Sequence, residues 1–192
     1  MDKKKVIQFF DQCASWWDDD MIRNEDIICK ILDNCEINQN SKVLDVACGT
    51  GVLFEDYLKR NVSSLTGIDI SSEMVKIAKS KYPNISILCG DVEVIEFDEK
   101  FNRIMVYNAF PHFSNPKKLI EHLVSLLSND GLLSIAHSMS RKALLEHHKR
   151  AQDVSIDLLE INELIELFKP HFNIKIAISN DEMYQIVGQK KH

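Results

Sequence analysis

The sequence of 192 residues lacks the features of membrane-spanning, secreted and zinc-binding proteins. No apolar run approaches the ~18 residues that a membrane helix needs. The basic start is not followed by the small-residue cleavage site of a signal peptide. The five cysteines are odd in number and show no C-x-x-C spacing, which is unlike a disulfide framework or a structural zinc site. We therefore expect reduced thiols, a cytoplasmic location and no membrane insertion.

Positive charge is also scarce, since 23 Lys and Arg face 29 Asp and Glu, for a net charge of −6. An acidic protein is repelled by a phosphate backbone unless it gathers a basic patch, and the basic clusters here are short. No nucleic-acid partner is expected. The hydrophobic share of 45% and charged share of 27% are ordinary for a globular protein, and the length suits one domain, residues 1–192.

Apolar residues alternate between helical spacing and short β-rich runs. The helical spacing predicts helices near residues 21–35, 53–58, 71–78, 116–127 and 157–168, the last opened by Asp157 and Glu160 as a capping box. The other runs predict strands near residues 42–47, 65–70, 85–89, 104–107 and 132–136, then a hairpin of residues 172–178 and 183–187. This order is typical of an α/β fold with a mainly parallel, doubly wound sheet and a terminal antiparallel hairpin. Ligands of such sheets bind at the carboxyl ends of the strands.

The segment VLDVACGTG, residues 43–51, joins a strand to a Gly-x-Gly turn and a helix. Glycines let the backbone approach a ligand closely, and a helix start offers N–H groups to an anion. Asp45, just before the turn, can accept hydrogen bonds from an ammonium group. Dinucleotide sites usually have a third glycine where this chain has Phe54. An ordinary tight turn is the alternative interpretation of the short Gly-x-Gly element.

Two further acidic residues follow the next two strands. Asp69 ends the second strand 18 residues after Gly51, where a carboxylate can bind both ribose hydroxyls or simply cap a helix. Asp91 follows the third strand, where it can accept the exocyclic amine of adenine between the apolar walls of Ile70 and Met74, or lie in a surface turn. Acids after three successive strands favour a nucleoside-containing ligand.

Together with residues 106–135, these motifs resemble class I S-adenosylmethionine-dependent methyltransferases over roughly residues 6–190. The likeness is strongest to the small-molecule group that includes ubiquinone- and menaquinone-biosynthesis enzymes. It implies a Rossmann-like sheet of seven strands in the order 3-2-1-4-5-7-6 and S-adenosylmethionine as cofactor. Residues 1–20 resemble that group's N-terminal segment, which packs over the cofactor. The cofactor-binding residues it implies are Asp45, Ala47, Gly49 and Gly51 at the methionyl end, Asp69 at the ribose, Ile70, Met74, Asp91 and Val92 at the adenine, Asn108 at the sulfur, and Trp17 in the covering segment.

Methyl transfer from a sulfonium is an in-line displacement, and a protonated acceptor also needs a base. Candidate catalytic residues are His137, His112, His148 and Arg141. We favour His137 as the base, with ordinary packing and a histidine metal site as alternatives. Arg141 can clamp an acceptor carboxylate or lie in solvent at a helix end. Residues 137–156 are expected to form a substrate-side wall.

The predicted function is methyl transfer from S-adenosylmethionine to a small-molecule acceptor, and a bound metal is the less favoured alternative. The residues after the fourth strand, beginning Asn108-Ala109, lack the Asn/Asp-Pro-Pro-aromatic motif of exocyclic-amine methyltransferases. An NAD-type oxidoreductase remains an alternative, because it shares the glycine turn and the ribose acid. A non-catalytic S-adenosylmethionine-binding protein is another.

Overall fold

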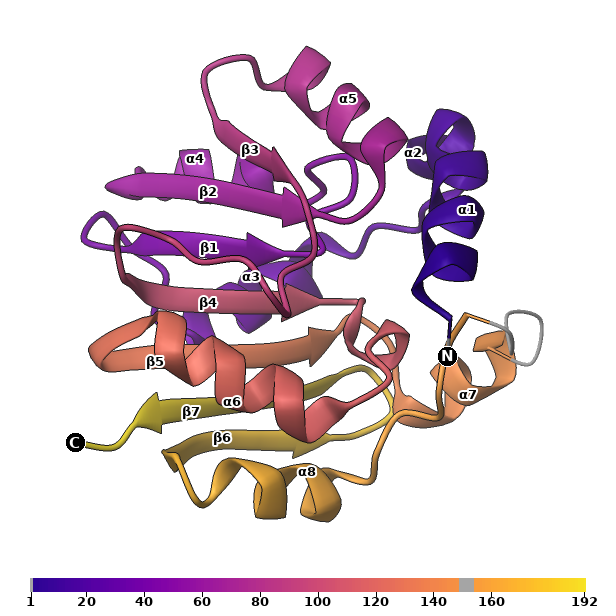
Figure 1. The fold of residues 1–192 in the computed structure, drawn as a ribbon. Coiled ribbons are helices and arrows are strands. Elements are labelled where there is room, and N and C mark those ends of the chain that lie inside the picture. The colour runs from indigo at the N-terminus through magenta and orange to yellow at the C-terminus, as the bar shows by residue number, and fades with distance from the viewer. Residues whose placement is uncertain (1, 149–153) are drawn as a thin grey trace.

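The computed structural model describes residues 2–148 and 154–192, without the side chains of residues 147 and 148. Its centre is a seven-stranded sheet in the order β3-β2-β1-β4-β5-β7-β6 (Figure 1). The strands are β1 Lys42–Val46, β2 Ser64–Asp69, β3 Ser86–Cys89, β4 Phe101–Tyr107, β5 Leu127–His137, β6 Phe172–Ser179 and β7 Tyr184–Lys190. The strands β1 to β5 run parallel, and β7 is antiparallel to both β5 and β6. The expected α/β class, strand order and terminal hairpin are confirmed.

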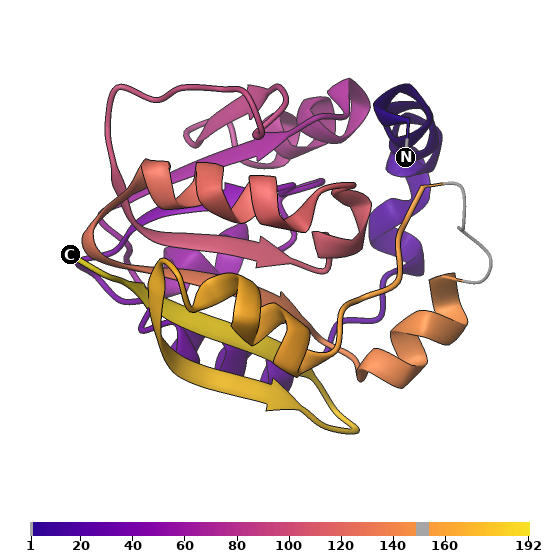
Figure 2. The ribbon, with the colours of Figure 1, turned by 60° about the horizontal axis from the view of Figure 1, so that its bottom comes forward.

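Helices cover both faces of this sheet. They are α1 Lys3–Cys13, η1 Ala14–Trp16, α2 Trp17–Asp20, α3 Glu25–Asn34, α4 Phe54–Lys59, α5 Ser72–Lys81, η2 Phe110–His112, α6 Pro116–Leu126, α7 Arg141–His148 and α8 Ile161–Phe168. One hydrophobic layer joins α3, α4 and α5 to the sheet, and the other joins α6 and α8 to it. Figure 2 shows α6 (salmon) and α8 (gold) in front of the sheet, with α3 and α4 (violet) behind it.

Alternate side chains of β1 point to opposite faces of the sheet, so this strand contributes residues to both hydrophobic layers. Leu44 and Val46 belong to the layer under α6 and α8, whereas Val43 belongs to the layer under α3 and α4. Successive strand residues point to opposite faces, so Asp45 shares the face of Val43. The carboxylate of Asp45 therefore lies in a strand whose other buried residues are apolar.

Phe54 occupies the position of the third glycine of a dinucleotide site. Gly67 of β2 has no side chain, which leaves space for the Phe54 ring. A Cβ atom added to Gly67 would lie 2.5 Å from the ring carbon Cζ of Phe54 and 2.9 Å from the sulfur of Cys48. The close approach of helix and sheet is thus made by a glycine on the strand and an aromatic ring on the helix. This differs from the arrangement expected of a dinucleotide-binding turn.

Three predicted boundaries were wrong by a few residues. The first long helix, α3, begins after Asn24, whose side chain accepts from the backbone N–H of Ile27 at 3.2 Å. The last helix, α8, begins after Glu160 rather than near Asp157, because the backbone N–H of Glu160 donates to Glu163 at 2.8 Å and completes a capping box there. The strand β5 already begins at residue 127, where it pairs with the start of β4.

Candidate active site

The turn after β1 leaves room beside its backbone. Ala47, Gly49 and Gly51 have φ angles of +54°, +55° and +82°, a left-handed conformation that glycine adopts without strain but alanine does not. A Cβ atom on Gly49 would meet nothing within 4 Å, whereas one on Gly51 would lie 2.9 Å from the Phe54 ring. Strain of the kind at Ala47 gathers at functional sites. Gly49 therefore borders open space into which a ligand fits against the backbone.

Asp69, at the end of β2, ties this turn to the start of α5. Its Oδ2 accepts from the backbone N–H of Gly49 at 2.8 Å, and its Oδ1 accepts from the N–H of Ser71 at 2.8 Å. Burial raises the pKa of the Asp69 carboxyl, although these two backbone bonds act against that rise. Each carboxylate oxygen keeps a second lone pair, so the group can also accept from hydroxyls of a ligand.

Asp45 is a buried carboxyl beside a second acid, with 2% of its surface exposed. Burial, together with the charge of Asp69, raises the pKa of Asp45 well above its ordinary value. In the described part of the chain, no hydrogen bond to the Asp45 carboxylate lowers its pKa again. A buried carboxyl without a donor is costly to ionise, and a ligand ammonium group would relieve that cost.

The third acid, Asp91, lies in the turn after β3 beside apolar side chains. Its Oδ1 accepts from the backbone N–H of Glu93 at 3.0 Å. Val92 and Met74 are buried, with 5% and 1% of their surfaces exposed, and Ile70 is half-buried. The role of these residues toward an adenine ring stays a prediction.

Charged residues of the N-terminal segment reach the turns after β1 and β2. The Thr50 hydroxyl donates to Asp18 at 2.5 Å, and Asp18 also pairs with Lys81 at 2.7 Å. The Ser71 hydroxyl donates to Asp11 at 2.5 Å. Figure 1 shows α1 beside the carboxyl ends of β1, β2 and β3.

Four residues of this site were missed in the sequence. They are Asp11, Asp18, Thr50 and Lys3, whose Nζ lies 2.5 Å from Oδ2 of Asp91. Thr50 stands inside the glycine motif and could have been considered. The other three are ordinary surface charges in the sequence and are joined to the site only by the fold. Trp17 packs edge-on against Phe10 with ring centres 5.7 Å apart, so its role toward a cofactor stays a prediction.

The ends of β4 and β5 are held together by Asn108. This residue has φ +52°, and its side-chain oxygen accepts from the backbone N–H of Ser138 at 3.0 Å while its Nδ2 donates to the Ser138 hydroxyl at 3.1 Å. Its own N–H donates to the carbonyl of Ala136 at 2.8 Å. Asparagine tolerates this left-handed conformation, which turns the chain toward η2.

His112 lies in η2, next to the N-terminal segment. Its Nδ1 is 2.8 Å from the carbonyl oxygen of Val154, and its ring packs edge-on against Phe10 with centres 4.9 Å apart. A carbonyl oxygen can only accept, so Nδ1 carries the proton in this bond. In the neutral ring, Nε2 is then the basic nitrogen.

The other three predicted catalytic residues have different surroundings. His137 ends β5 and is fully buried, with its ring 6.2 Å from that of Tyr184. Arg141 donates to the carbonyl of Leu158 at 2.8 Å and pairs with Glu160 at 2.7 Å, so it joins α7 to the start of α8. The side chain of His148, like residues 149–153 of the predicted substrate-side wall, lies outside the described residues.

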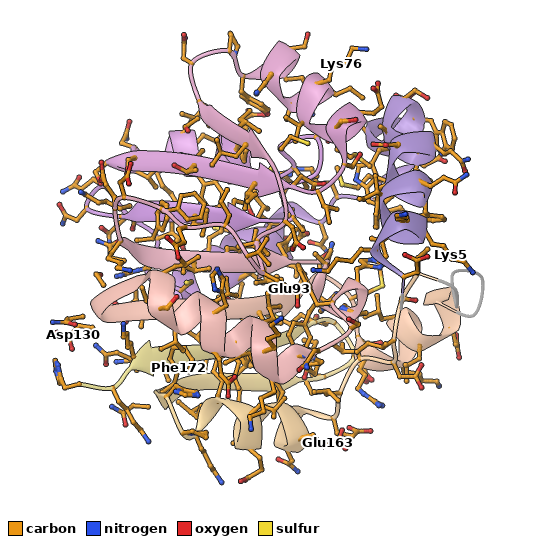
Figure 3. All side chains as sticks on the ribbon, viewed as in Figure 1. Lys5, Lys76, Glu93, Asp130, Glu163 and Phe172 are labelled. Carbon is orange, nitrogen blue, oxygen red and sulfur yellow. The ribbon has the colours of Figure 1, made fainter. Side chains whose placement is uncertain are left out.

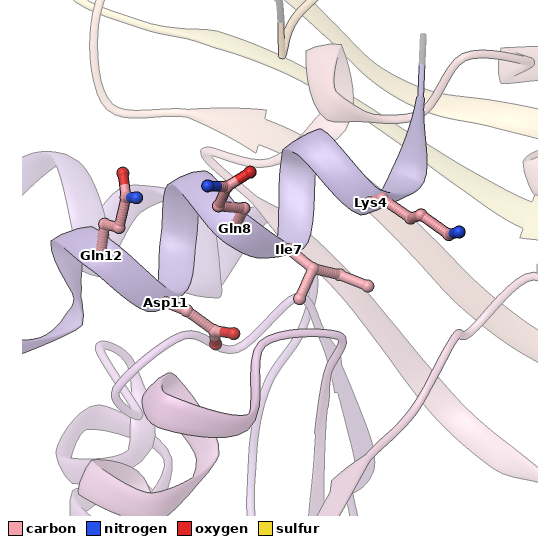
Figure 4. Close-up of a pocket in the computed structure, with 5 residues that line it drawn as sticks. All are labelled: Lys4, Ile7, Gln8, Asp11 and Gln12. Carbon is pink, nitrogen blue, oxygen red and sulfur yellow. The ribbon is translucent and has the colours of Figure 1, made fainter.

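Two surface grooves lie on α1 and beside α7. One is lined by residues of α1, with Ile7 and Asp11 on one side of the helix and Gln8 and Gln12 on the other (Figure 4). The second lies between α7 and the turn joining β6 to β7. Neither includes the three strand-end acids, so neither is the cofactor site expected from the sequence.

Residues 2–148 and 154–192 contain neither a metal-binding cluster nor a membrane-spanning helix. No group of three or more His, Cys, Asp or Glu is placed there to hold a metal ion. Within the same ranges, no helix is long and apolar enough to cross a membrane. The five cysteines are free thiols.

Comparison with known proteins points to one family. Residues 43–131 match the family described as "Methyltransferase domain". A malonyl-[acyl-carrier protein] O-methyltransferase of Ilyobacter polytropus is 27% identical over 192 residues, covering 92% of this chain and 70% of the relative. A ubiquinone biosynthesis O-methyltransferase of Coxiella burnetii is 26% identical over 143 residues, covering 69% of this chain and 61% of the relative. The chain thus spans less than two thirds of the second relative's length.

The fold is shared with solved structures. The magnesium protoporphyrin IX methyltransferase of Synechocystis, solved with bound S-adenosylhomocysteine, aligns with a TM-score of 0.75 at 15% identity over 99% of this chain and 100% of that one. These findings favour neither a nicotinamide-dependent oxidoreductase nor a non-catalytic binding protein. The matched domain and the strand order agree: residues 43–131 carry a methyltransferase domain, and the chain has the class I fold of S-adenosylmethionine-dependent methyltransferases.

Proposed function

We propose that this chain transfers the methyl group of S-adenosylmethionine to an oxygen atom of a small-molecule acceptor. The main support for this cofactor site is the position of three carboxylates, Asp45, Asp69 and Asp91. They lie at the ends of three adjacent strands, beside the open space at Gly49. Oxygen is proposed as the methylated atom because both curated relatives are named O-methyltransferases. Their acceptors differ, so neither acceptor is assigned to this chain.

The residues fit the parts of S-adenosylmethionine in order along the sheet edge. Asp45, buried without a donor in the described chain, suits the ammonium group of the methionyl part. Asp69 suits the ribose hydroxyls because its oxygens keep free lone pairs. Asp91 suits the adenine amine, with Val92 and Met74 against the ring. The backbone at Ala47, Gly49 and Gly51 would approach the methionyl part, and Ile70, Asn108 and Trp17 complete the proposed set.

When bound, S-adenosylmethionine supplies a methyl group on a positively charged sulfur. The acceptor oxygen forms a bond to the methyl carbon as the carbon–sulfur bond breaks, and the bonding pair stays on sulfur. The acceptor must also lose its proton. We assign that proton to Nε2 of His112, because the bond from Nδ1 to the Val154 carbonyl makes Nε2 the basic nitrogen.

His137 is a weaker candidate for this base than the sequence indicated. A ring with no exposed surface cannot meet an acceptor without a rearrangement around β5 and Tyr184. Arg141 is already engaged by Glu160 and Leu158, so it serves better as a support for α7 than as a carboxylate clamp. Both roles stay predictions, as do the cytoplasmic location and the absence of a nucleic-acid partner.

The test of the base is His112→Gln, assayed by release of S-adenosylhomocysteine with a panel of phenols and carboxylic acids. We expect kcat to fall by roughly 10²–10⁴-fold, with the affinity for S-adenosylhomocysteine unchanged within about twofold. The rise of kcat with pH that we expect for the unmodified protein should disappear. His122→Gln is a matched control, because His122 also bonds a backbone carbonyl, that of Ile95 at 3.0 Å. A loss of cofactor affinity equal to the loss of kcat would refute the role.

A further inference from the structure

We propose that Lys3 competes with the cofactor's adenine for Asp91, so that the contact of Lys3 with Asp91 and Glu93 is a latch that cofactor binding opens. The inference rests on the proposed function, because it takes Asp91 as the adenine-binding acid. It adds Lys3, which lies in α1 and outside the strand-end motifs, to the residues that set the affinity for the cofactor.

Lys3 occupies the oxygen that adenine would need. Its Nζ lies 2.5 Å from Asp91 Oδ2 and 2.5 Å from Glu93 Oε2. The other oxygen of Asp91, Oδ1, already accepts from the backbone N–H of Glu93 at 3.0 Å. Both oxygens of Asp91 therefore have a donor. Each keeps a second lone pair, as in Asp69, but the donor at Oδ2 is here a charged ammonium group shared with Glu93, so the exocyclic amine of adenine competes with it for that oxygen.

The ammonium group of Lys3 forms ion pairs with both Asp91 and Glu93. The Glu93 side chain is only 6% exposed and that of Asp91 is 24% exposed, while Lys3 itself is 45% exposed. Partial burial lowers the pKa of Lys3, but the hydrogen bonds to Asp91 and Glu93 outweigh it and raise the pKa overall. Lys3 thus remains protonated at neutral pH and keeps its hold on Asp91.

The same segment binds the other two turns of the site. Asp11 accepts from the Ser71 hydroxyl after β2, and Asp18 accepts from the Thr50 hydroxyl after β1. The N-terminal segment therefore holds one residue in each of the turns that follow β1, β2 and β3. Partly exposed ion pairs of this kind contribute little each, so the latch is weak enough for a ligand to open.

The test compares two ligands on two variants by calorimetry. S-Adenosylhomocysteine carries the 6-amino group, whereas S-inosylhomocysteine has at that position a carbonyl, which accepts hydrogen bonds and cannot replace the donor to Asp91. For Lys3→Met we expect S-adenosylhomocysteine to bind roughly three- to tenfold more tightly, the range expected for loss of one partly exposed ion-pair cluster. The inosyl analogue should bind no more tightly than before. A general change in packing would move both ligands together.

Lys76→Met is the matched control, because Lys76 pairs with Glu73 at 3.5 Å on α5. Figure 3 shows Lys76 on the outer side of α5, pointing away from α1. This variant should bind both ligands like the unmodified protein. Raising the salt concentration should tighten S-adenosylhomocysteine binding in the unmodified protein relative to Lys3→Met, because salt screens the latch.

The outcomes separate the two proposals. If the unmodified protein binds no S-adenosylhomocysteine, the proposed function fails and the latch fails with it. If it binds, but Lys3→Met leaves the affinity unchanged, only the latch fails. If Lys3→Met weakens both ligands equally, Lys3 closes over the bound cofactor instead of competing with it, and the latch is again wrong.

Discussion

Asp45 shows how a single residue can favour ligand binding at the expense of stability. Its carboxyl is buried and lies near the like charge of Asp69, and both raise its pKa. A raised pKa in the folded state means that the folded chain holds a proton that the unfolded chain has released. The free energy of unfolding therefore falls as pH rises from the ordinary carboxyl pKa to the raised one, and stays lower above it.

Asp45→Asn should therefore stabilise the free protein at neutral pH and weaken cofactor binding. We expect a gain on the order of 1–3 kcal/mol, which corresponds to a rise in Tm of roughly 2–12 °C for a chain of this size. The gain should vanish at low pH, where Asp45 is protonated. Thermal melts at several pH values and titration with S-adenosylhomocysteine check this. A lower Tm at neutral pH would contradict it.

Asp69→Ala should weaken S-adenosylmethionine binding by about one to two decades, as expected for lost charge-assisted hydrogen bonds. The variant also removes the bonds to Gly49 and Ser71, so some loss of order in the turn is expected. Circular dichroism establishes whether the fold persists, and calorimetry gives the affinity. An intact fold with unchanged affinity would rule out Asp69 as the ribose acid.

At the scale of the elements, the contact between α4 and β2 depends on Gly67. A Cβ atom there would lie 2.5 Å from the Phe54 ring, so Gly67→Ala should lower the free energy of unfolding by about 1–3 kcal/mol. Adding Phe54→Leu should restore part of that loss, because the two sites share one space. Urea denaturation measures both.

Gly90→Ala is the control for this pair, since its nearest neighbour would lie at an ordinary 3.7 Å. It should change stability far less than Gly67→Ala. Equal destabilisation by the two alanines would show that the close approach to Phe54 is not the cause.

Most elements could be predicted from the sequence because their signals are local. The apolar alternation located the strands, and Ser71 was expected near the start of α5, where its hydroxyl accepts from the N–H of Met74 at 3.2 Å. The start of α8 was predicted too early, because Asp157 and Glu160 resemble a capping box as closely as the true pair does. Glu160 is fixed as the cap by its ion pair with Arg141, a contact across the fold.

At the scale of the whole molecule, the strand-end acids could be predicted because parallel strands bring their carboxyl ends to one edge. The contacts of Lys3, Asp11 and Asp18 could not, because nothing local in the sequence separates them from solvent-exposed charges. The burial of His137 was missed for a related reason. Its position at a strand end indicated the site, but the packing of the β7 residue Tyr184 against it comes from the terminal hairpin.

Because the turns and the N-terminal segment meet at one site, a ligand there should stabilise the chain as a unit. S-Adenosylhomocysteine at 100 times its Kd should add about 2.7 kcal/mol to the free energy of unfolding, or a rise in Tm of roughly 5–11 °C. Differential scanning fluorimetry measures this. Asp69→Ala at the same ligand concentration should show a much smaller rise.

The most direct test of the cofactor site is calorimetric titration of the protein with S-adenosylhomocysteine, with and without a chelator, beside a titration with NADH. The account predicts one micromolar site for S-adenosylhomocysteine, unaffected by the chelator, and no comparable site for NADH. Binding of NADH without binding of S-adenosylhomocysteine would contradict it, and a chelator-sensitive site would place a metal in a protein for which none is proposed.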